Sequence, residues 1–349
     1  MARRRNLWIL LGIVAIVGAG SWLLGGRTPH LPQAPLGAVP AGTTAVLHVD
    51  VEAVLGSVIW QRLVADRGGD TGVRRIEELC GGDPLGALSE VTAFASGSAP
   101  GDLEWVGLIA RGAFDGEDLG SCVSRVVEAD GGSLRQITIA GVPAVAGRGA
   151  SRAAFIGADG IAGGDEEVVT AIVRAVRGDE PSAARDPVLA RLWTTVARGR
   201  DIAFVAHIPD GWRRALQERL RASTDASLGA IAGARALGLG AGLRDGLGVE
   251  AVLSMRDEST ATEAARALEG LIEGALDAGG LSAAVTRPLV RQLAVEARGH
   301  DVHLTLRLSA ERLDRTLSLL LAIWDTPARD RGAPQRLEAT PDAIIERDE

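Results

Sequence analysis

The chain has 349 residues, with 37 basic and 45 acidic side chains, two cysteines and no tyrosine, and every one of the basic residues is arginine. Without lysine, the chain has no Schiff-base lysine, no P-loop lysine and no Ser–Lys dyad. Without the four arginines of the first 27 residues, 33 basic residues stand against 45 acidic ones. This balance argues against nucleic acid as a partner, because binding to phosphates depends on basic side chains.

Residues 1–26 predict a transmembrane helix that anchors the protein in the inner (cytoplasmic) membrane. Three arginines at positions 3–5 precede an uncharged run from Leu7 to Gly26, and twenty helical residues span about 30 Å, the thickness of the hydrocarbon core. The arginines favour a cytoplasmic N-terminus and a C-terminal body on the periplasmic, extracytoplasmic side. The alternative is a signal peptide cleaved after Val17-Gly18-Ala19, although the apolar run continues beyond that point.

Two further segments are expected to lie outside the folded body. Residues 27–42 contain four prolines and little that could form a core, which predicts a semi-rigid, extended spacer. Residues 326–349 are charged and interrupted by three prolines, which predicts a solvated, mostly disordered tail.

A weak internal duplication divides the sequence between these segments. Thr44–Asp50 is followed by apolar residues at helical spacing, and so is Asp201–His207, at an offset of 157 residues without a gap. Each copy predicts a short strand that leads into an amphipathic helix. We therefore expect two similar modules, residues 43–185 and residues 186–325.

Downstream of this opening, both modules carry alternating stretches and amphipathic helices. In the first module we expect strands at 91–95, 105–110, 134–139, 142–146 and 153–156, and helices from 115 and over 165–176. In the second we expect strands at 236–243, 247–255, 293–297 and 302–308, and helices around 265–276 and from 309. Tight-turn sequences at 158–160, 244–246 and 299–301 indicate antiparallel pairing. The predicted fold class is α+β, an N-terminal transmembrane helix followed by two similar modules of antiparallel sheet covered by helices.

The opening Ala45-Val-Leu-His-Val-Asp50, with Val54-Leu55 after it, resembles the repeat opening D-A-V-L-F-V-D-V-x-x-L. That opening is found in uncharacterised exported bacterial proteins with one N-terminal membrane anchor and duplicated strand–strand–helix modules. The resemblance covers residues 43–325 and implies the same layout. It implies no activity.

Cys80 and Cys122 are the two cysteines of the chain. An exported protein with two cysteines commonly pairs them, so we expect a structural disulfide between them. The alternative is two buried free thiols.

Two patterns invite a ligand-binding interpretation. Gly238-Leu-Gly240-Ala-Gly242 lacks the spacing of a dinucleotide loop, and its alternate glycines favour close approach of a helix over a ligand surface. His48 and Asp50 share a strand face, and His207 lies on the second opening strand, but these residues do not form a symmetric ligand set. We therefore expect no metal site and no cofactor.

No catalytic motif stands out, since the chain has neither a G-x-S-x-G elbow nor an S-x-x-K sequence. The sequence therefore favours a membrane-anchored envelope protein with a non-catalytic binding or interaction module, whose partner is an envelope protein or an apolar ligand. One alternative is an envelope hydrolase with a site assembled from scattered Asp, Glu, His and Arg. A second is a structural or assembly subunit.

Overall fold

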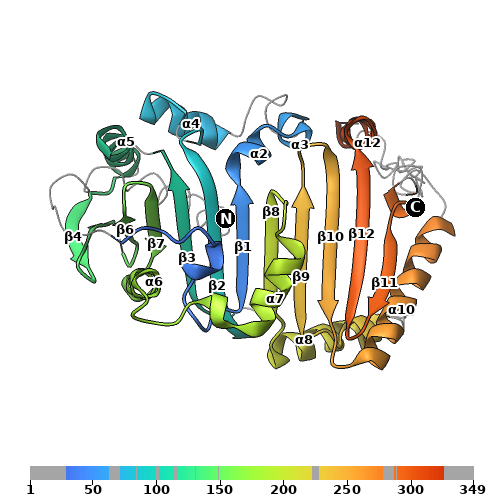
Figure 1. The fold of residues 1–349 in the computed structure, drawn as a ribbon. Coiled ribbons are helices and arrows are strands. Elements are labelled where there is room, and N and C mark those ends of the chain that lie inside the picture. The colour runs from blue at the N-terminus through green and yellow to red at the C-terminus, as the bar shows by residue number, and fades with distance from the viewer. Residues whose placement is uncertain are drawn as a thin grey trace, which may run out of the picture.

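The computed structural model describes residues 29–325, apart from residues 63–70, 84, 100–101, 114–115, 130, 148, 222–227, 278–286 and 288. Twelve strands form one antiparallel sheet in the order β11-β12-β10-β9-β8-β1-β2-β3-β7-β6-β5-β4, with helices packed on it (Figure 1). The fold is therefore α+β with a large antiparallel sheet. The predicted anchor, residues 1–26, and the predicted tail, residues 326–349, lie outside the described residues. Of the helices that are described, none has both the length and the apolar character needed to cross a membrane.

The chain builds the sheet in two halves. The strands of the N-terminal half are β1 (Ala45–Asp50), β2 (Leu88–Ala99), β3 (Asp102–Gly112), β4 (Arg135–Ile139), β5 (Val142–Ala146), β6 (Arg152–Ile156) and β7 (Gly160–Gly164). Those of the C-terminal half are β8 (Ile202–His207), β9 (Ala236–Gly242), β10 (Gly246–Ser254), β11 (Ala294–Arg298) and β12 (Asp301–Ser309). Successive strands are mostly joined by short turns, as the sequence predicted, because antiparallel neighbours need no long crossover.

The helices also follow the two halves. The N-terminal half contains η1 (Pro35–Gly37), α2 (Val51–Leu55), α3 (Val58–Trp60), α4 (Thr71–Cys80), α5 (Gly116–Ala129) and α6 (Glu166–Arg177). The C-terminal half contains η3 (Ala183–Arg185), α7 (Pro187–Val196), α8 (Asp210–Arg221), α9 (Leu228–Ile231), α10 (Glu258–Asp277) and α12 (Ala310–Asp325).

The two halves meet at β1 and β8, which pair edge to edge in the middle of the sheet. Leu47 lies directly opposite Phe204, the residue 157 positions later that the sequence alignment had matched to it. Outward from this pair the strands follow in the same order, β2 and β3 on one side and β9 and β10 on the other. We had expected a sheet in each module, whereas the strands of both form one continuous sheet.

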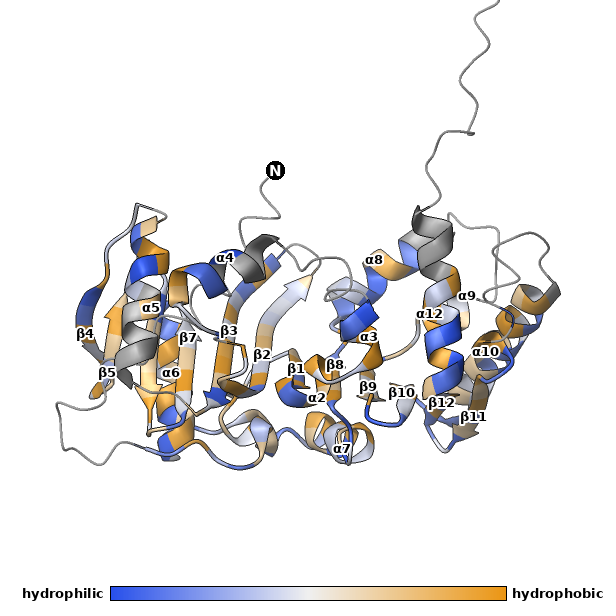
Figure 2. Cartoon of the chain, turned by 90° about the horizontal axis from the view of Figure 1, so that it is seen from above, coloured by the Kyte–Doolittle hydropathy of each residue, from blue (hydrophilic) through white to orange (hydrophobic). Residues whose placement is uncertain are grey.

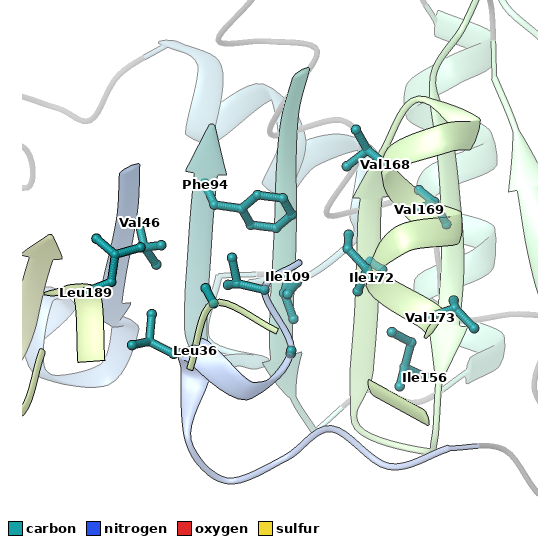
Figure 3. Packing of buried hydrophobic residues seen from close by; sticks show 14 of the residues in the cluster. Leu36, Val46, Phe94, Ile109, Ile156, Val168, Val169, Ile172, Val173 and Leu189 are labelled. Atoms are coloured by element: carbon teal, nitrogen blue, oxygen red, sulfur yellow. The ribbon is translucent and has the colours of Figure 1, made fainter. Parts of the chain in front are cut away.

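Helices cover both faces of the sheet (Figure 2). The face that carries α6 and α7 is called the front face here, and the opposite face, which carries α4, α5, α10 and α12, the back face. On the front face, one hydrophobic core joins both halves (Figure 3). It contains Val46 of β1 and Val205 of β8 together with Leu189 of α7 and Ile172 of α6, all of which are fully buried. The two halves are therefore held together by a shared core as well as by backbone pairing.

The prediction of an extended spacer over residues 27–42 is wrong for the part that the structure describes. Leu36 and Val39 are buried in the front core, and Val39 accepts a backbone hydrogen bond of 2.8 Å from Ala183. Arg111 of β3 donates to the carbonyl oxygen of Pro32 at 2.8 Å. We call residues 29–42 the N-terminal strap. Its prolines restrict the unfolded chain without preventing the apolar residues between them from packing.

The alternate glycines of β9 let α7 approach the front face closely, as the sequence favoured. A Cβ atom at Gly240 would overlap the carbonyl oxygen of Val196 at the end of α7, and one at Gly238 would lie 3.0 Å from the side chain of Val196. The sequence analysis did not predict α7 itself, although Asp186 caps its first turn and Pro187 occupies the first helical position.

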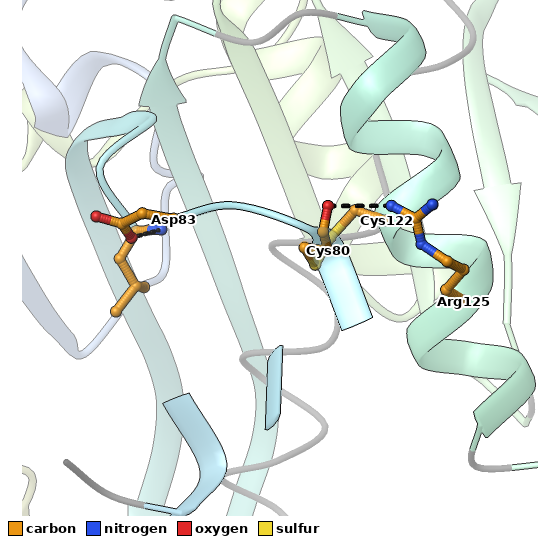
Figure 4. The surroundings of a disulfide bond; sticks show 5 residues. Cys80, Asp83, Cys122 and Arg125 are labelled. Atoms are coloured by element: carbon orange, nitrogen blue, oxygen red, sulfur yellow. Dashed lines mark hydrogen bonds between the residues drawn. A yellow bond between two sulfur atoms is a disulfide. The ribbon is translucent and has the colours of Figure 1, made fainter. Parts of the chain in front are cut away.

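A disulfide joins Cys80 at the end of α4 to Cys122 of α5 (Figure 4), with the two Cα atoms 4.3 Å apart. The predicted pairing is confirmed. Arg125, one turn further along α5, donates a hydrogen bond of 3.0 Å to the carbonyl oxygen of Cys80. The bridge therefore fixes two back-face helices of the N-terminal half to each other.

Candidate functional site

Apolar side chains line the centre of the back face. Three rows of directly opposed residues run across the six central strands, β3, β2, β1, β8, β9 and β10, and every residue in them is apolar. The middle row is Leu108, Ala93, Leu47, Phe204, Leu239 and Ala251. The flanking rows are Val106, Ala95, Ala45, Ala206, Leu237 and Leu253, and Ala110, Val91, Val49, Ile202, Ala241 and Val249. We call these residues the apolar floor.

The floor is buried in some places and open in others. Leu108 and Ala110 are buried on β3, and Ala110 belongs to the same buried cluster as Cys122 of α5. By contrast, Leu47 of β1 is 38% exposed, and Val106, also on β3, is 41% exposed. A large aliphatic side chain usually gains about 1.5–3 kcal/mol when it is fully buried, so these exposed residues mark a surface that binding could cover.

Helix α8 adds further apolar side chains near this surface. It begins against the end of β2, where a Cβ atom at Gly211 would lie 2.5 Å from the carbonyl oxygen of Ser98. One turn apart on α8, Trp212 and Leu216 are 41% and 39% exposed. The helix therefore presents exposed apolar surface of its own next to the C-terminal end of strand β2.

A second candidate site of different chemistry lies on the front face of β10, β12 and β11. A hollow of about 240 Å³ is lined mainly by charged and polar side chains. These are Arg200, Glu250, Glu296, Arg298, His303, Thr305 and Arg307. We call this site the charged hollow.

Ion pairs organise the side chains of the charged hollow. Arg200, in the loop after α7, lies 3.3 Å from one carboxylate oxygen of Glu250, whose other oxygen is 3.9 Å from Nδ1 of His303. Arg298 donates to Glu296 at 2.6 Å. The hydrogen bond from Arg298, with a smaller contribution from the charge of His303, lowers the pKa of Glu296. Glu296 is therefore ionised at neutral pH.

The histidines on the opening strands have structural partners. His48 packs edge-on against the ring of Trp193, 5.8 Å away, and its Nδ1 is 3.0 Å from the hydroxyl of Thr92. Burial lowers the pKa of His48, against the opposing effect of nearby carboxylates. His207 is hydrogen-bonded to Asp186 at 2.9 Å. The structure does not bring His48 and His207 together as ligands of one metal ion.

Asp50 takes part in a polar network at the junction of the two halves. Arg244, in the turn between β9 and β10, contacts Asp50 and Asp201, each at 3.0 Å. Asp201 also accepts a hydrogen bond of 2.6 Å from the backbone N–H of Leu243, and Asp50 caps α2 by accepting from Ala53. The network joins the ends of β1 and β8, which is a structural role. No group of three or more potential metal ligands occurs within the described residues.

Neither candidate site was predicted from the sequence. The floor could have been found from the alternation in β1, where Ala45, Leu47 and Val49 share one face. The charged hollow has no local signal, because strand pairing brings together Arg200, Glu250 and Arg307 from distant parts of the chain.

Comparisons with known proteins add little to this geometry. No protein-family model matches the chain, and no curated protein matches it significantly. The solved structure of TP0453 in its crystal form I is similar over 82% of this chain and 98% of that chain, with 12% sequence identity and a TM-score of 0.45. A likeness of this size gives no basis for transferring function from TP0453.

Proposed function

We propose that this protein is a non-catalytic binding module whose apolar floor docks an amphipathic helix of a partner protein. The observation that carries the proposal is the contiguous apolar surface, on which Leu47 of β1 and Val106 of β3 are exposed. Helix-in-groove recognition uses this chemistry, since an apolar helix stripe removes such a surface from water.

The dimensions of the floor favour a helix over a second copy of this chain. Six strands at about 4.8 Å spacing extend about 24 Å, and three rows extend about 14 Å along the strands. A stable dimer of two copies needs about 800 Å² from each copy, more than the roughly 340 Å² that these spacings give, whereas a docked helix can form a smaller, transient interface. A helix of about sixteen residues is 24 Å long and about 10 Å wide, which matches this outline.

We further propose that the protein is an envelope protein with a single membrane anchor formed by residues 1–26. The uncharged run after three arginines supports this proposal, and so does the Cys80–Cys122 disulfide, because disulfides persist in oxidising compartments. We also infer that residues 43–185 and 186–325 are modules related by duplication. The equivalent strand order on either side of the Leu47–Phe204 pair supports this inference.

Site-specific photo-crosslinking in intact cells tests the docking proposal. A photo-reactive amino acid at position 47 or 106 should give the same protein adduct, and one at Glu167, which is exposed on the front face, should not. Leu47→Asp should reduce the adduct formed from position 106 at least about tenfold, the effect of losing about 1.4 kcal/mol.

Three other results would contradict the proposal. One is an adduct at all three positions, and another is an adduct with lipid alone. The third is a protein adduct from position 106 that Leu47→Asp leaves unchanged while the variant melts like the parent protein.

A further inference from the structure

The charged hollow lies where the front face carries no described helix. Helix α7 packs over β8 and β9, and α10 and α12 lie on the back face. The front-facing residues of β12 are correspondingly polar, and so are Glu296 and Arg298 of β11. His303, Thr305 and Arg307 alternate along β12, opposite Val252, Glu250 and Gly248 of β10.

Two arginines that line this hollow are both placed beside one glycine. Arg307 is the direct cross-strand neighbour of Gly248. Arg200 reaches the same place from the loop after α7, and its Nη1 lies 3.1 Å from where a Cβ atom of Gly248 would be. The missing side chain therefore makes the space that Arg200 occupies.

The two arginines differ in whether a carboxylate forms an ion pair with them. Arg200 is paired with Glu250, and both side chains are 24% exposed. Arg307 is exposed and makes no ion pair with any side chain in the described part of the chain. Arg298 and Glu296 neutralise each other at the other end of the hollow. Three arginines of the hollow therefore stand against two glutamates, although the whole chain has a net charge of −8.

We propose that the charged hollow binds a small organic anion, whose carboxylate or phosphate group is held between Arg200 and Arg307 above Gly248. Guanidinium groups present paired donors that match the oxygens of such groups. Glu296 and the hydroxyl of Thr305 face the remaining volume and accept hydrogen bonds from donors elsewhere on the ligand. A volume of about 240 Å³ limits the ligand to the size of a small metabolite. This site is independent of the apolar floor, which lies on the opposite face.

Titration calorimetry with two probes tests the assignment. Citrate supplies carboxylates and inorganic phosphate supplies a phosphate group, so the pair distinguishes the two chemistries. At least one probe should bind saturably with one site per chain, and Arg307→Gln should weaken its binding at least about tenfold, since a hydrogen bond to a charged group contributes about 1.5–3 kcal/mol. Arg312→Gln, which removes an exposed arginine on α12, should leave binding unchanged.

Gly248→Val tests the geometry with every charge kept. Its side chain would occupy the space of the Arg200 guanidinium, so it should weaken binding as strongly as Arg307→Gln. A melting temperature equal to that of the parent protein shows that Gly248→Val folds. If Gly248→Val does not fold, Arg307→Gln alone tests the assignment. The assignment is overturned if neither probe binds saturably, or if Arg312→Gln weakens binding as much as Arg307→Gln.

Discussion

The front faces of the two halves differ in what covers them, and the difference follows from the strands themselves. In the N-terminal half, the row His48, Thr92, Ile109, Ala162 and Ala154 runs outward from the junction and ends under α6. The corresponding row of the C-terminal half is Val205, Gly238, Val252, His303 and Glu296. Its outer residues face the charged hollow.

The faces that the helices cover in each half follow from the residues in these rows. β6 and β7 are apolar on both faces, so α6 packs on the front while α5 covers the back. β11 and β12 alternate between apolar and polar residues, and only their back face is covered, by α10 and α12. A strand that is apolar throughout needs cover on both faces, whereas an alternating strand needs it on one. Equivalent positions in one sheet can therefore become core in one half and a site in the other.

Substituting the residues that end these two rows should give the largest difference in the free energy of unfolding. Ala154 is fully buried under α6, whereas Glu296 is 60% exposed. Ala154→Glu should lower the free energy of unfolding by about 4 kcal/mol or more, because it buries an unpaired charge. Glu296→Ala should change it by no more than about 0.5 kcal/mol. Denaturant unfolding measures both values, and equal losses would refute the contrast between the halves.

Reduction of the disulfide should have the next largest effect. The halves join their back-face helices differently, since α4 and α5 share the Cys80–Cys122 bridge while α9 and α10 pack through small residues such as Ala230 and Ala264. Closing a loop of 42 residues contributes about 4 kcal/mol in the chain-entropy model. Thermal melts with and without reductant should differ accordingly. A variant with both cysteines changed to serine should melt low and not respond to reductant.

Adding a methyl group to the glycine stripe of β9 should have an intermediate effect. Gly240 occupies the place that Phe94 has in the N-terminal half, and α7 rests directly on it. Gly240→Ala should destabilise the protein by about 1–3 kcal/mol, the usual effect of overpacking. Gly242→Ala is the matched control, because its Cβ would lie 3.5 Å from the guanidinium of Arg200, an ordinary contact. If both variants unfold at the same denaturant concentration, α7 does not pack on Gly240 as described.

The contribution of Asp186 to the pH dependence of stability should be the smallest of these effects. Desolvation raises the pKa of Asp186, but hydrogen bonds from the backbone of Leu189 and from His207 outweigh it, so the pKa in the folded protein lies below 3.8. Because the folded pKa is the lower one, the stabilisation is present above pH 3.8 and is lost as the pH falls through the folded value. The melting temperatures of the parent protein and of Asp186→Asn should therefore converge in acid. If the two melting temperatures diverge in acid instead, the pKa of Asp186 is not lowered in the folded protein.

Local patterns in the sequence predicted much of the fold. Alternation and tight turns gave the antiparallel strands, and the paired cysteines gave the disulfide. β7 escaped prediction because Gly160-Ile-Ala-Gly-Gly164 contains three glycines, which disfavour strands unless neighbours pack against the bare backbone. In the structure, Val168 of α6 does so at Gly164.

Contacts between distant segments could not be predicted from the sequence. The pairing of β1 with β8 joins residues that are far apart in the sequence, such as Leu47 and Phe204, which are 157 positions apart. The same holds for both candidate sites. Leu47 lies in an ordinary alternating strand, and its exposure depends on where the helices of both halves end. Arg200 and Arg307 lie far apart in the sequence, and only the folded sheet places both beside Gly248.

The N-terminal strap also determines how the protein would respond to mechanical force. Tension applied at Pro29 would reach Pro32 and Val39, which are tied to β3 and to the start of η3, before it reached β1. Leu36 and Val39 share a core with Leu189 of α7 and Val205 of β8. The load would therefore be shared between both halves of the sheet, and the first strand would not be peeled away alone.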